Sequence, residues 1–257
     1  MARENNVVLV GKVKAPRIRS KEAEGAELFK VSFTLTTLRS NGREDAPRIN
    51  VYDLTAEKAD KLYSQLVHRP FAMVRGMITT RMKPKEMVCP ICGEKTTVNV
   101  LVTEIAAFGA PAILKDEKDA LKFKEISNSA QVMGEVCSGV SKLNDNCTGY
   151  QICLERRYVI KEQNGIKKDY PWVKSFDENA VRDFEHLHPH SLVYINGSFQ
   201  TKETLNIIKC RTPGCAGEAK YPNSAGEIVT HNVEYLHNCF FEPKSLHRQK
   251  LGSALGA

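Results

Sequence analysis

Four of the eight cysteines occur in two short clusters whose spacing suits metal binding. Cys89 and Cys92 lie in CPICG, a zinc-knuckle sequence in which the glycine eases the tight turn beside the second thiolate. Cys210 and Cys215 lie in CRTPGC, again close to proline and glycine. Structural zinc needs four ligands, and the first pair has no further Cys or His nearby in the sequence. We therefore expect one zinc site that the two pairs share.

Two other arrangements of these cysteines stay open at this point. The second pair could form its own site with His231, His237 or Cys239, while the first pair is left unfilled or is completed between subunits. Both pairs could also be reduced thiols without metal. Other cysteines have different expectations, because Cys137 and Cys153 fall in strand patterns and should be buried, whereas Cys147 looks like a loop thiol. The run that holds His186, His188 and His190 is expected to be a surface loop.

The overall composition is that of an ordinary globular protein of 257 residues, with 42% hydrophobic and 26% charged residues. Lys and Arg exceed Asp and Glu by 37 to 30, and a net charge of +7 fits a polyanionic partner. The sequence contains no signal-peptide pattern and no run of roughly 18 apolar residues, so we expect a cytoplasmic protein without a membrane span. It also lacks phosphate-loop, H-E-x-x-H, G-x-S-x-G and deaminase motifs, so we do not expect an enzyme.

An internal duplication organises the chain. Gly11 and Gly134, Gly76 and Gly197, and the two cysteine pairs recur at an offset of 121–123 residues, and Val51 matches Val173 at 122. This period is too long for a solenoid repeat, so each copy should be a whole domain. The sequence therefore predicts a first domain over 1–108, a linker over 109–126, a second domain over 127–243 and a flexible tail over 244–257.

Each copy has the element order of a small barrel. In the first copy, alternating or β-rich segments at 7–13, 28–37, 48–54, 71–82 and 97–105 predict five strands, with a bend expected at Gly11. A short helix between the third and fourth strands is indicated by Ala59, Leu62 and Leu66, with Thr55 as N-cap. The helix of the second copy carries Val181, Phe184 and Leu187 and is capped near Asp177. We expect a mainly β protein of two tandem five-stranded OB folds, each with a cysteine-containing hairpin insertion between its fourth and fifth strands.

The first copy resembles the bacterial single-stranded DNA-binding proteins. The segments NNVVLVGKV, LFKVSFTLTT, RIN, the helix and VRGMITT match that family in order over most of residues 5–105. The cysteine insertions depart from the family, as does the absence of an acidic tail ending in Pro-Phe. That absence puts the usual partners in replication or recombination in doubt, so a role in a phage, plasmid or mobile element is an equal expectation.

The resemblance places one face of the third strand toward nucleic acid. Asn50, Tyr52 and Leu54 share that face in the first copy, as do Trp172, Lys174 and Phe176 in the second. Exposed rings stack on bases and cations neutralise phosphates, which together suit binding to a single strand. The alternative is that Tyr52 and Trp172 are core or interface residues.

Most of the remaining candidates for phosphate contacts are cations in hairpin loops. The predicted basic contacts are Arg17, Arg19, Arg39, Arg43, Arg48, Arg156, Arg157, Lys167, Lys168 and Lys174. We thus expect sequence-independent binding of single-stranded DNA, with RNA binding or a protein-interaction module as alternatives. Pairing of two chains through the barrels is a further expectation.

Overall fold

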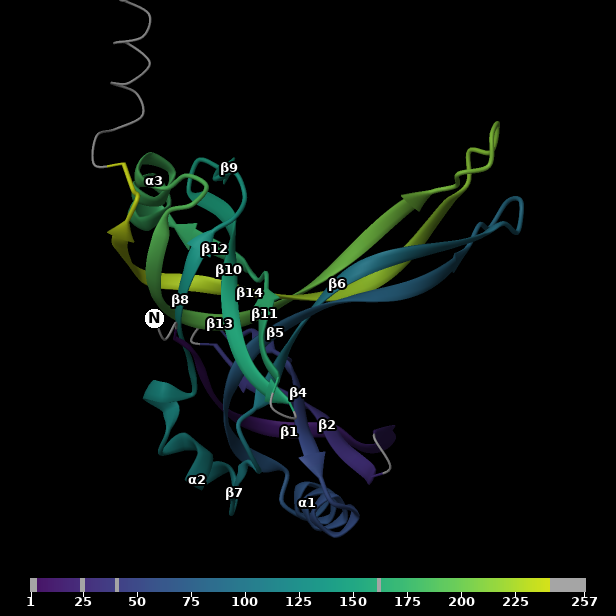
Figure 1. The fold of residues 1–257 in the computed structure, drawn as a ribbon, viewed down its shortest axis with the longest axis vertical. Helices are drawn as coiled ribbons and strands as arrows, with labels where there is room; N and C mark the ends of the chain where they lie inside the picture. Colours follow the sequence, from purple (N-terminus) through teal and green to yellow (C-terminus); the bar gives the residue numbers. More distant parts are fainter. Residues whose placement is uncertain (1–3, 24–25, 40–41, 161–162, 241–257) are drawn as a thin grey trace, which may run out of the picture.

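The computed structural model describes residues 4–23, 26–39, 42–160 and 163–240 (Figure 1). The tail predicted over 244–257 lies outside the described residues. The first half of the described chain contains β1 (Asn5–Ala23), β2 (Ala26–Leu38), β3 (Glu44–Asp45), β4 (Arg48–Leu54), α1 (Ala56–His68), β5 (Phe71–Val88) and β6 (Lys95–Ala107). The second half contains β8 (Asn128–Val136), β9 (Ser141–Asn144), β10 (Cys147–Ile160), β11 (Gln163–Asp169), β12 (Trp172–Phe176), α3 (Asp177–His186), β13 (Leu192–Lys209) and β14 (Glu218–His237).

The prediction of a mainly β chain is confirmed, but the strands extend further than expected. They follow one hydrogen-bonded path of neighbouring strands through both halves, so neither half is a clean, separate five-stranded barrel. The segment predicted as a linker contains β7 (Ala112–Leu114), α2 (Glu117–Leu121) and a single 3₁₀ turn (Lys124–Ile126), and β7 pairs with β5. None of the described helices is long and apolar enough to span a membrane.

The first helix follows the prediction. The hydroxyl of Thr55 accepts a hydrogen bond from the Lys58 N–H, which satisfies one of the unpaired donors at the start of α1. Ala59, Leu62 and Leu66 are buried on the face that covers the end of the first half. The pattern of apolar residues therefore predicted both the helix and its buried side.

The helix of the second half, α3, differs from the prediction. Its N-cap is Phe176, and Asp177 lies inside the first turn with a φ of 52°. The buried side chains of α3 are Ala180 and Asp183, whereas Val181 is exposed. The reason is that the polar Asp183 occupies a core position of α3; of the three predicted apolar residues, only Leu187, directly after the helix, is fully buried.

Asp183 is buried because three hydroxyl groups surround its carboxylate. Oδ1 accepts a hydrogen bond from the Tyr235 hydroxyl at 2.7 Å, and Oδ2 accepts one from Tyr150 at 3.0 Å and another from Ser175. Burial raises the pKa of Asp183 although these three hydrogen bonds lower it. The second half thus has a buried carboxylate beneath its helix, where the inward face of α1 is lined by Ala59, Leu62 and Leu66.

The two halves show the same order of strand pairings. Ile49 on β4 pairs in parallel with Ile105 on β6, and Val173 on β12 pairs in parallel with Ile228 on β14. This register makes Ile49, and not Val51, the counterpart of Val173, so the predicted offset of 122 was wrong for the third strand. By the same register, Arg48 corresponds to Trp172 and Tyr52 corresponds to Phe176.

Strands β1 and β8 join the halves by antiparallel pairing. Asn5 pairs with Val132 and Leu9 pairs with Asn128, so the pairing is symmetric about Val7 and Ala130. The two asparagines also act alike, since the side chain of Asn5 bonds the backbone of Ile78 and that of Asn128 bonds the backbone of Phe199. In Figure 1 the helices α1 and α3 consequently lie at opposite ends of the molecule.

Gly11 allows β1 and β2 to approach each other closely and does not form the predicted bend. A Cβ at this position would lie 2.1 Å from the carbonyl oxygen of Thr36. The irregularity in β1 lies further on, between Lys14 and Arg17, where Ala15 has a φ of 49°. The glycine therefore marks where β1 and β2 press together, while the bulge redirects the outer part of the β1–β2 hairpin.

Candidate metal centre and nucleic-acid interface

Two long hairpins, β5–β6 and β13–β14, extend side by side from the body of the molecule (Figure 1). Their tips carry the four clustered cysteines, whose Sγ atoms all lie within 4.8 Å of one another. The predicted convergence of the two pairs is confirmed. Cys239, by contrast, contacts the Leu192 and His237 carbonyls, and no other group of three or more metal-ligating side chains occurs among residues 4–240 as described.

The sulfur geometry fits a tetrahedral metal ion. Sγ of Cys89 is 3.7 Å from Sγ of Cys215, and Sγ of Cys92 is 3.6 Å from Sγ of Cys210. A zinc ion with Zn–S bonds of about 2.3 Å in a tetrahedron requires sulfur–sulfur separations of about 3.8 Å. Each close pair combines one cysteine from each hairpin, so a bound metal would cross-link the two tips.

Both tips are shaped by turns that hold their cysteines in place. The Cys89 carbonyl accepts the Gly93 N–H, and Gly93 adopts a φ of 72°. On the other hairpin, the Cys210 N–H donates to the Gly217 carbonyl. Gly217 lies so close to the cluster that a Cβ there would be 2.3 Å from Sγ of Cys89, which leaves room only for glycine.

The thiols of the cluster titrate unevenly. Hydrogen bonds between the Cys210 sulfur and the hydroxyl and backbone N–H of Thr212 lower the pKa of Cys210 to about 6. The N–H of Gly217 acts in the same direction on Cys215, but desolvation and the neighbouring thiols raise the pKa of Cys215 to about 12. Since metal ligation requires thiolates, an ion bound here would displace the protons that the cluster retains.

Of Cys137, Cys147 and Cys153, one lies where it was predicted and two do not. Cys153 is buried in β10, as predicted. Cys147 is also buried in β10, because β9 and β12 pair on either side of it, so it is not a loop thiol. Cys137 is exposed just beyond the end of β8 and is not a core residue.

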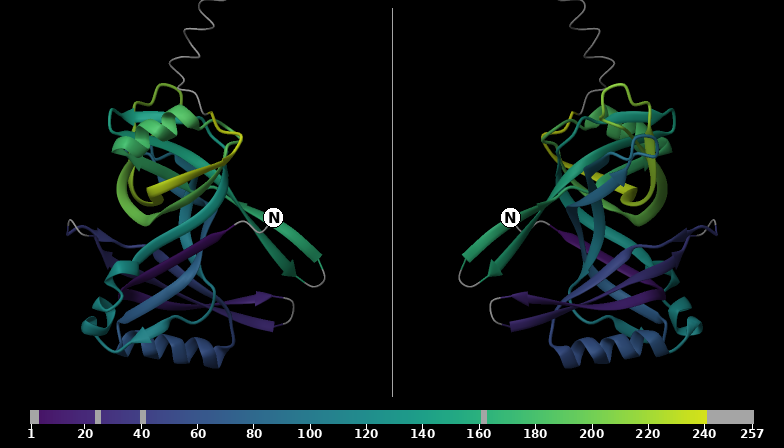
Figure 2. Two further views of the ribbon diagram at one scale, coloured as in Figure 1. Left: turned by 90° about the vertical axis from the view of Figure 1, so that its left-hand side faces the viewer. Right: turned by 90° about the vertical axis from the view of Figure 1, so that its right-hand side faces the viewer.

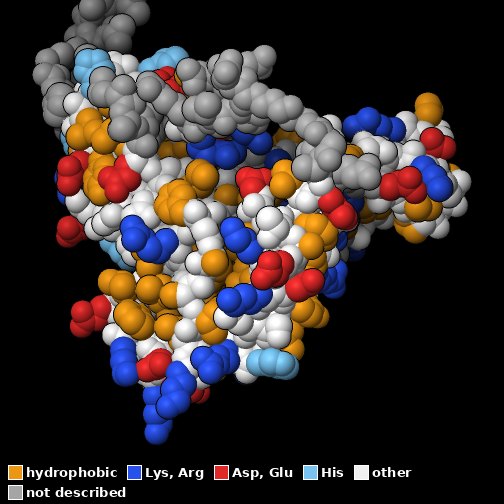
Figure 3. Space-filling view, turned by 60° about the horizontal axis from the view of Figure 1, so that its bottom comes forward, with side chains coloured by type: hydrophobic (Ala, Val, Ile, Leu, Met, Phe, Trp, Pro, Cys, Tyr) orange, Lys and Arg blue, Asp and Glu red, His pale blue; other side chains and the backbone are white. Residues whose placement is uncertain are grey.

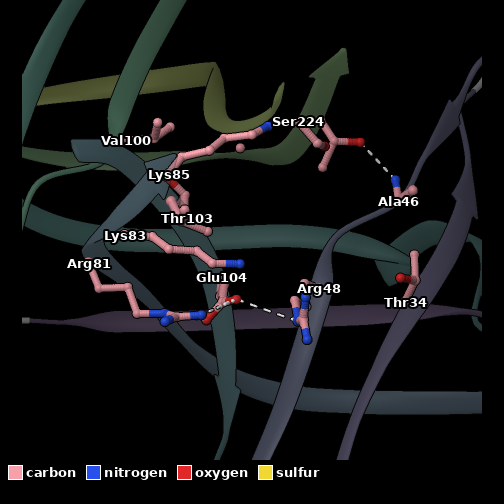
Figure 4. Close-up of a pocket in the computed structure, with 13 residues that line it drawn as sticks. Thr34, Ala46, Arg48, Arg81, Lys83, Lys85, Val100, Thr103, Glu104 and Ser224 are labelled. Carbon is pink, nitrogen blue, oxygen red and sulfur yellow. Dashed lines mark hydrogen bonds and ion pairs between the residues drawn. The ribbon is translucent and has the colours of Figure 1, made fainter. Parts of the chain in front are cut away.

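A cavity of about 380 Å³ lies where the hairpin arms leave the body (Figure 4). Its cationic side is formed by Arg48 on β4 and by Arg81, Lys83 and Lys85, which alternate along one face of β5. The second half supplies the polar residues Thr201 and Ser224 and the small residue Gly226. We call this feature the β4–β5 cavity.

Glu104 organises the cations of the β4–β5 cavity. It is 2% exposed, lies 3.0 Å from Arg81 and 3.5 Å from Arg48, and accepts a hydrogen bond from Asn50. Burial alone would raise the pKa of Glu104, but the hydrogen bonds from Arg81 and the charges of Arg81, Arg48 and Lys30 hold it below its usual value. Figure 4 shows both guanidinium groups directed at this carboxylate.

The predicted aromatic contacts are exposed. Tyr52 is 43% and Trp172 is 45% exposed, so neither is a core residue. The amine of Lys30 lies 5.5 Å from the centre of the Tyr52 ring. Phe176, at the position that corresponds to Tyr52, is 43% exposed, and Tyr170 before β12 is 37% exposed.

Three of the predicted basic contacts are held closely by carboxylates, in addition to Arg48 at Glu104 and the exposed Lys168, which lies 3.8 Å from Glu155. Arg39 donates two hydrogen bonds to the buried Asp45, and Arg156 pairs in the same way with the buried Asp169. Lys174 lies 2.6 Å from Glu227. These cations contribute to the structure of the halves, and their charge is largely offset where they stand.

Other predicted cations are exposed on hairpins. Arg17 and Arg19 lie on β1, Lys167 and Lys168 lie on β11, and Arg43 lies between β2 and β3. The side chain of Arg157 lies outside the described residues. Figure 2 shows the β1–β2 and β10–β11 hairpins projecting from the same side of the molecule. On the face in Figure 3, Lys and Arg side chains are interspersed with acidic and apolar ones.

The cations of β5 were missed by sequence reasoning, which searched the hairpin loops. Arg81, Lys83 and Lys85 recur at every second residue at and just beyond the end of the fourth predicted strand, and this alternation was the available signal. Lys30 and Glu104 were missed as well, because single charges inside strand patterns carry no indication of their partners.

Comparison with known proteins gives matches only at the level of structure. No family model and no curated protein matches the chain. A crystal structure of the wild-type single-stranded DNA-binding protein from Thermus aquaticus matches with a TM-score of 0.54 and 14% identity, covering 93% of this chain and 95% of that one. A deletion mutant of the same protein matches with a TM-score of 0.55 and 15% identity, covering 94% of this chain and 98% of that one. The chain therefore has the fold of the Thermus aquaticus single-stranded DNA-binding protein.

Proposed function

We propose that this protein binds single-stranded DNA without sequence preference. The observation that carries the proposal is the likeness of the fold, over 94% of the chain, to a single-stranded DNA-binding protein. Exposed rings at Tyr52 and Trp172 and the cations of the β4–β5 cavity supply the two features that such binding needs, which are stacking surfaces and positive charge. A protein of this kind covers strands that are exposed during replication, recombination or transfer.

We further propose that the two halves are duplicated OB barrels. The equivalent parallel pairings at Ile49–Ile105 and Val173–Ile228, and the symmetric β1–β8 contact, support this reading. The extra strands β3, β7, β9 and β11 then count as additions to the edges of the barrels.

Titration of a labelled oligo-dT strand tests the binding proposal. Affinity should fall as salt rises, with a slope of about −0.7 per contacted phosphate. A duplex of the same length should bind much more weakly, because its bases are already stacked. Equal affinity for duplex and single strand, or no binding at low salt, would contradict the proposal. Tighter binding to the matching RNA strand would identify RNA as the preferred partner.

We propose that the metal held by Cys89, Cys92, Cys210 and Cys215 is zinc. The thiolate ligands and the sulfur separations support this choice. The ion would fix the two hairpin tips to each other and has no chemistry with the strand. Elemental analysis of protein purified under reducing conditions should give one zinc per chain, and Cys89→Ser and Cys210→Ser should each remove it. Two zinc ions per chain would indicate separate sites.

A further inference from the structure

The two halves present different side chains at equivalent positions around the hairpin arms. Gly76 on β5 pairs with Val7 as Gly197 on β13 pairs with Ala130, which sets the correspondence between β5 and β13. Counted from these glycines, Arg81, Lys83 and Lys85 of the first half correspond to Lys202, Thr204 and Asn206 of the second. Two of the three cations of the β4–β5 cavity that lie on β5 thus have uncharged counterparts.

The carboxylates beneath these positions are also neutralised differently. Glu104 and Glu227 occupy equivalent places. Glu104 directly precedes Ile105, which pairs with Ile49, and Glu227 directly precedes Ile228, which pairs with Val173. Glu104 is bonded by the neutral Asn50, so its charge is matched by Arg48 and Arg81 from the cavity side. Glu227 is instead matched by Lys174, which replaces Asn50 and lies 2.6 Å away. Glu227 thus has a cation at the position where the first half has the neutral Asn50.

The second half has two more rings than the first along its third strand and the residues just before it. Trp172 and Phe176 lie on one face of β12 on either side of Lys174, and Tyr170 precedes the strand; the three rings are 37–45% exposed. Their counterparts in the first half are Ala46, Arg48 and Tyr52. We call the three rings of the second half the aromatic surface.

We infer that the two halves hold different parts of one strand, with phosphates in the β4–β5 cavity and stacked bases on the aromatic surface. This inference rests on the proposed function and adds to it that the two halves contact different chemical groups of the strand. Arginine and lysine side chains around a polar cavity attract phosphate oxygens, and the hydroxyls of Thr201 and Ser224 can donate to them. Half-exposed rings give bases surfaces on which stacking does not depend on sequence.

The test replaces residues of the cavity and of the aromatic surface and measures binding of oligo-dT at several salt concentrations. Lys83→Thr/Lys85→Asn places the second half's own residues in the cavity, and Trp172→Leu removes one ring. The lysine variant should reduce the salt slope by about 1.4, because two phosphate contacts are lost. Trp172→Leu should leave the slope unchanged while it weakens binding by about tenfold or more. Lys61→Thr, an exposed cation on α1, is the matched control and should change neither quantity.

A strand of abasic residues separates the two contributions further, because it keeps the phosphates and lacks the bases. Trp172→Leu should bind this strand as well as wild type does, whereas the lysine variant should bind it more weakly. If the double variant does not fold, Lys83→Thr alone repeats the test with half the expected change in slope.

The inference is overturned if wild-type protein binds oligo-dT but the lysine variant keeps the full salt slope. It is also overturned if Trp172→Leu lowers the slope as much as the lysine variant does. Failure of wild-type protein to bind any single strand would instead contradict the proposed function itself, so the two failures can be told apart.

Discussion

The backbone N–H of Thr201 donates a hydrogen bond to Oδ1 of Asp45, 2.6 Å away in the other half of the chain. The counterpart contact is present too, since the N–H of Thr80 donates to Oδ1 of Asp169 at 2.6 Å. Each aspartate is fully buried and paired with an arginine of its own half, Arg39 or Arg156. Each half is therefore hydrogen-bonded, through its buried aspartate, to the long hairpin of the other half.

Asp45→Ala should lower the free energy of unfolding by about 3 kcal/mol, because removal of one partner leaves Arg39 uncompensated and Thr201 without its acceptor. Urea denaturation followed by circular dichroism measures the change. Glu44→Ala is the control, since Glu44 is exposed and its ion pair with Lys14 should be worth at most about 1 kcal/mol. Equal effects of the two substitutions would show that the buried contact does not brace the halves.

Gly217→Ala should weaken zinc binding by about 10- to 100-fold, because the added methyl group would press on Sγ of Cys89. Competition with a chromophoric chelator gives the affinity. Gly109→Ala, where an added Cβ meets nothing within 4 Å, should bind zinc as wild type does. Unchanged affinity in the Gly217 variant would mean that the cysteines do not close around one ion.

Stability should depend on pH through Asp183. Its pKa is raised in the folded protein, so the folded state holds the proton more tightly than the unfolded state does. The contribution of Asp183 to stability is therefore greatest at low pH and falls as pH rises from about 4 through the folded-state pKa. Thermal unfolding of wild type and Asp183→Asn across this range should show wild type gaining on the variant as pH falls. A constant difference would contradict the raised pKa.

Trp172 should report on the bound strand directly, because it is the only tryptophan and is 45% exposed. Iodide should quench its fluorescence in the free protein. Saturating oligo-dT should protect it, since a stacked base covers the face of the ring. An equal concentration of duplex serves as the control, and unchanged iodide quenching with bound oligo-dT would remove Trp172 from the interface.

The elements of the first half and the cysteine cluster could be predicted because their signals are local or come in pairs. Thr55 with Ala59, Leu62 and Leu66 specifies a capped amphipathic helix, and four thiolates in two knuckles leave few ways to complete one site. The repeated landmarks in the sequence supplied the missing step, because they indicated that the two knuckles occupy equivalent hairpins.

The register of the third strand and the partners of single charges could not be predicted in the same way. Alternation along a strand is unchanged by a shift of two residues, so the offset that matched Val51 with Val173 fitted the pattern as well as the true one. The shared Asp-x-Pro at Asp45 and Asp169 would have fixed it. Whether Arg39 faces solvent or a buried carboxylate depends on tertiary contacts that its own segment does not encode.

The antiparallel pairing of β1 with β8 has a consequence for how this molecule can change over evolutionary time. When two separate copies of one chain meet at such a contact, every substitution appears on both sides, and the complex comes apart on dilution. Here one continuous backbone joins the paired strands, so the contact forms at any protein concentration. A substitution in one half is then inherited by that half alone, which leaves each side free to specialise while the other keeps its original side chains.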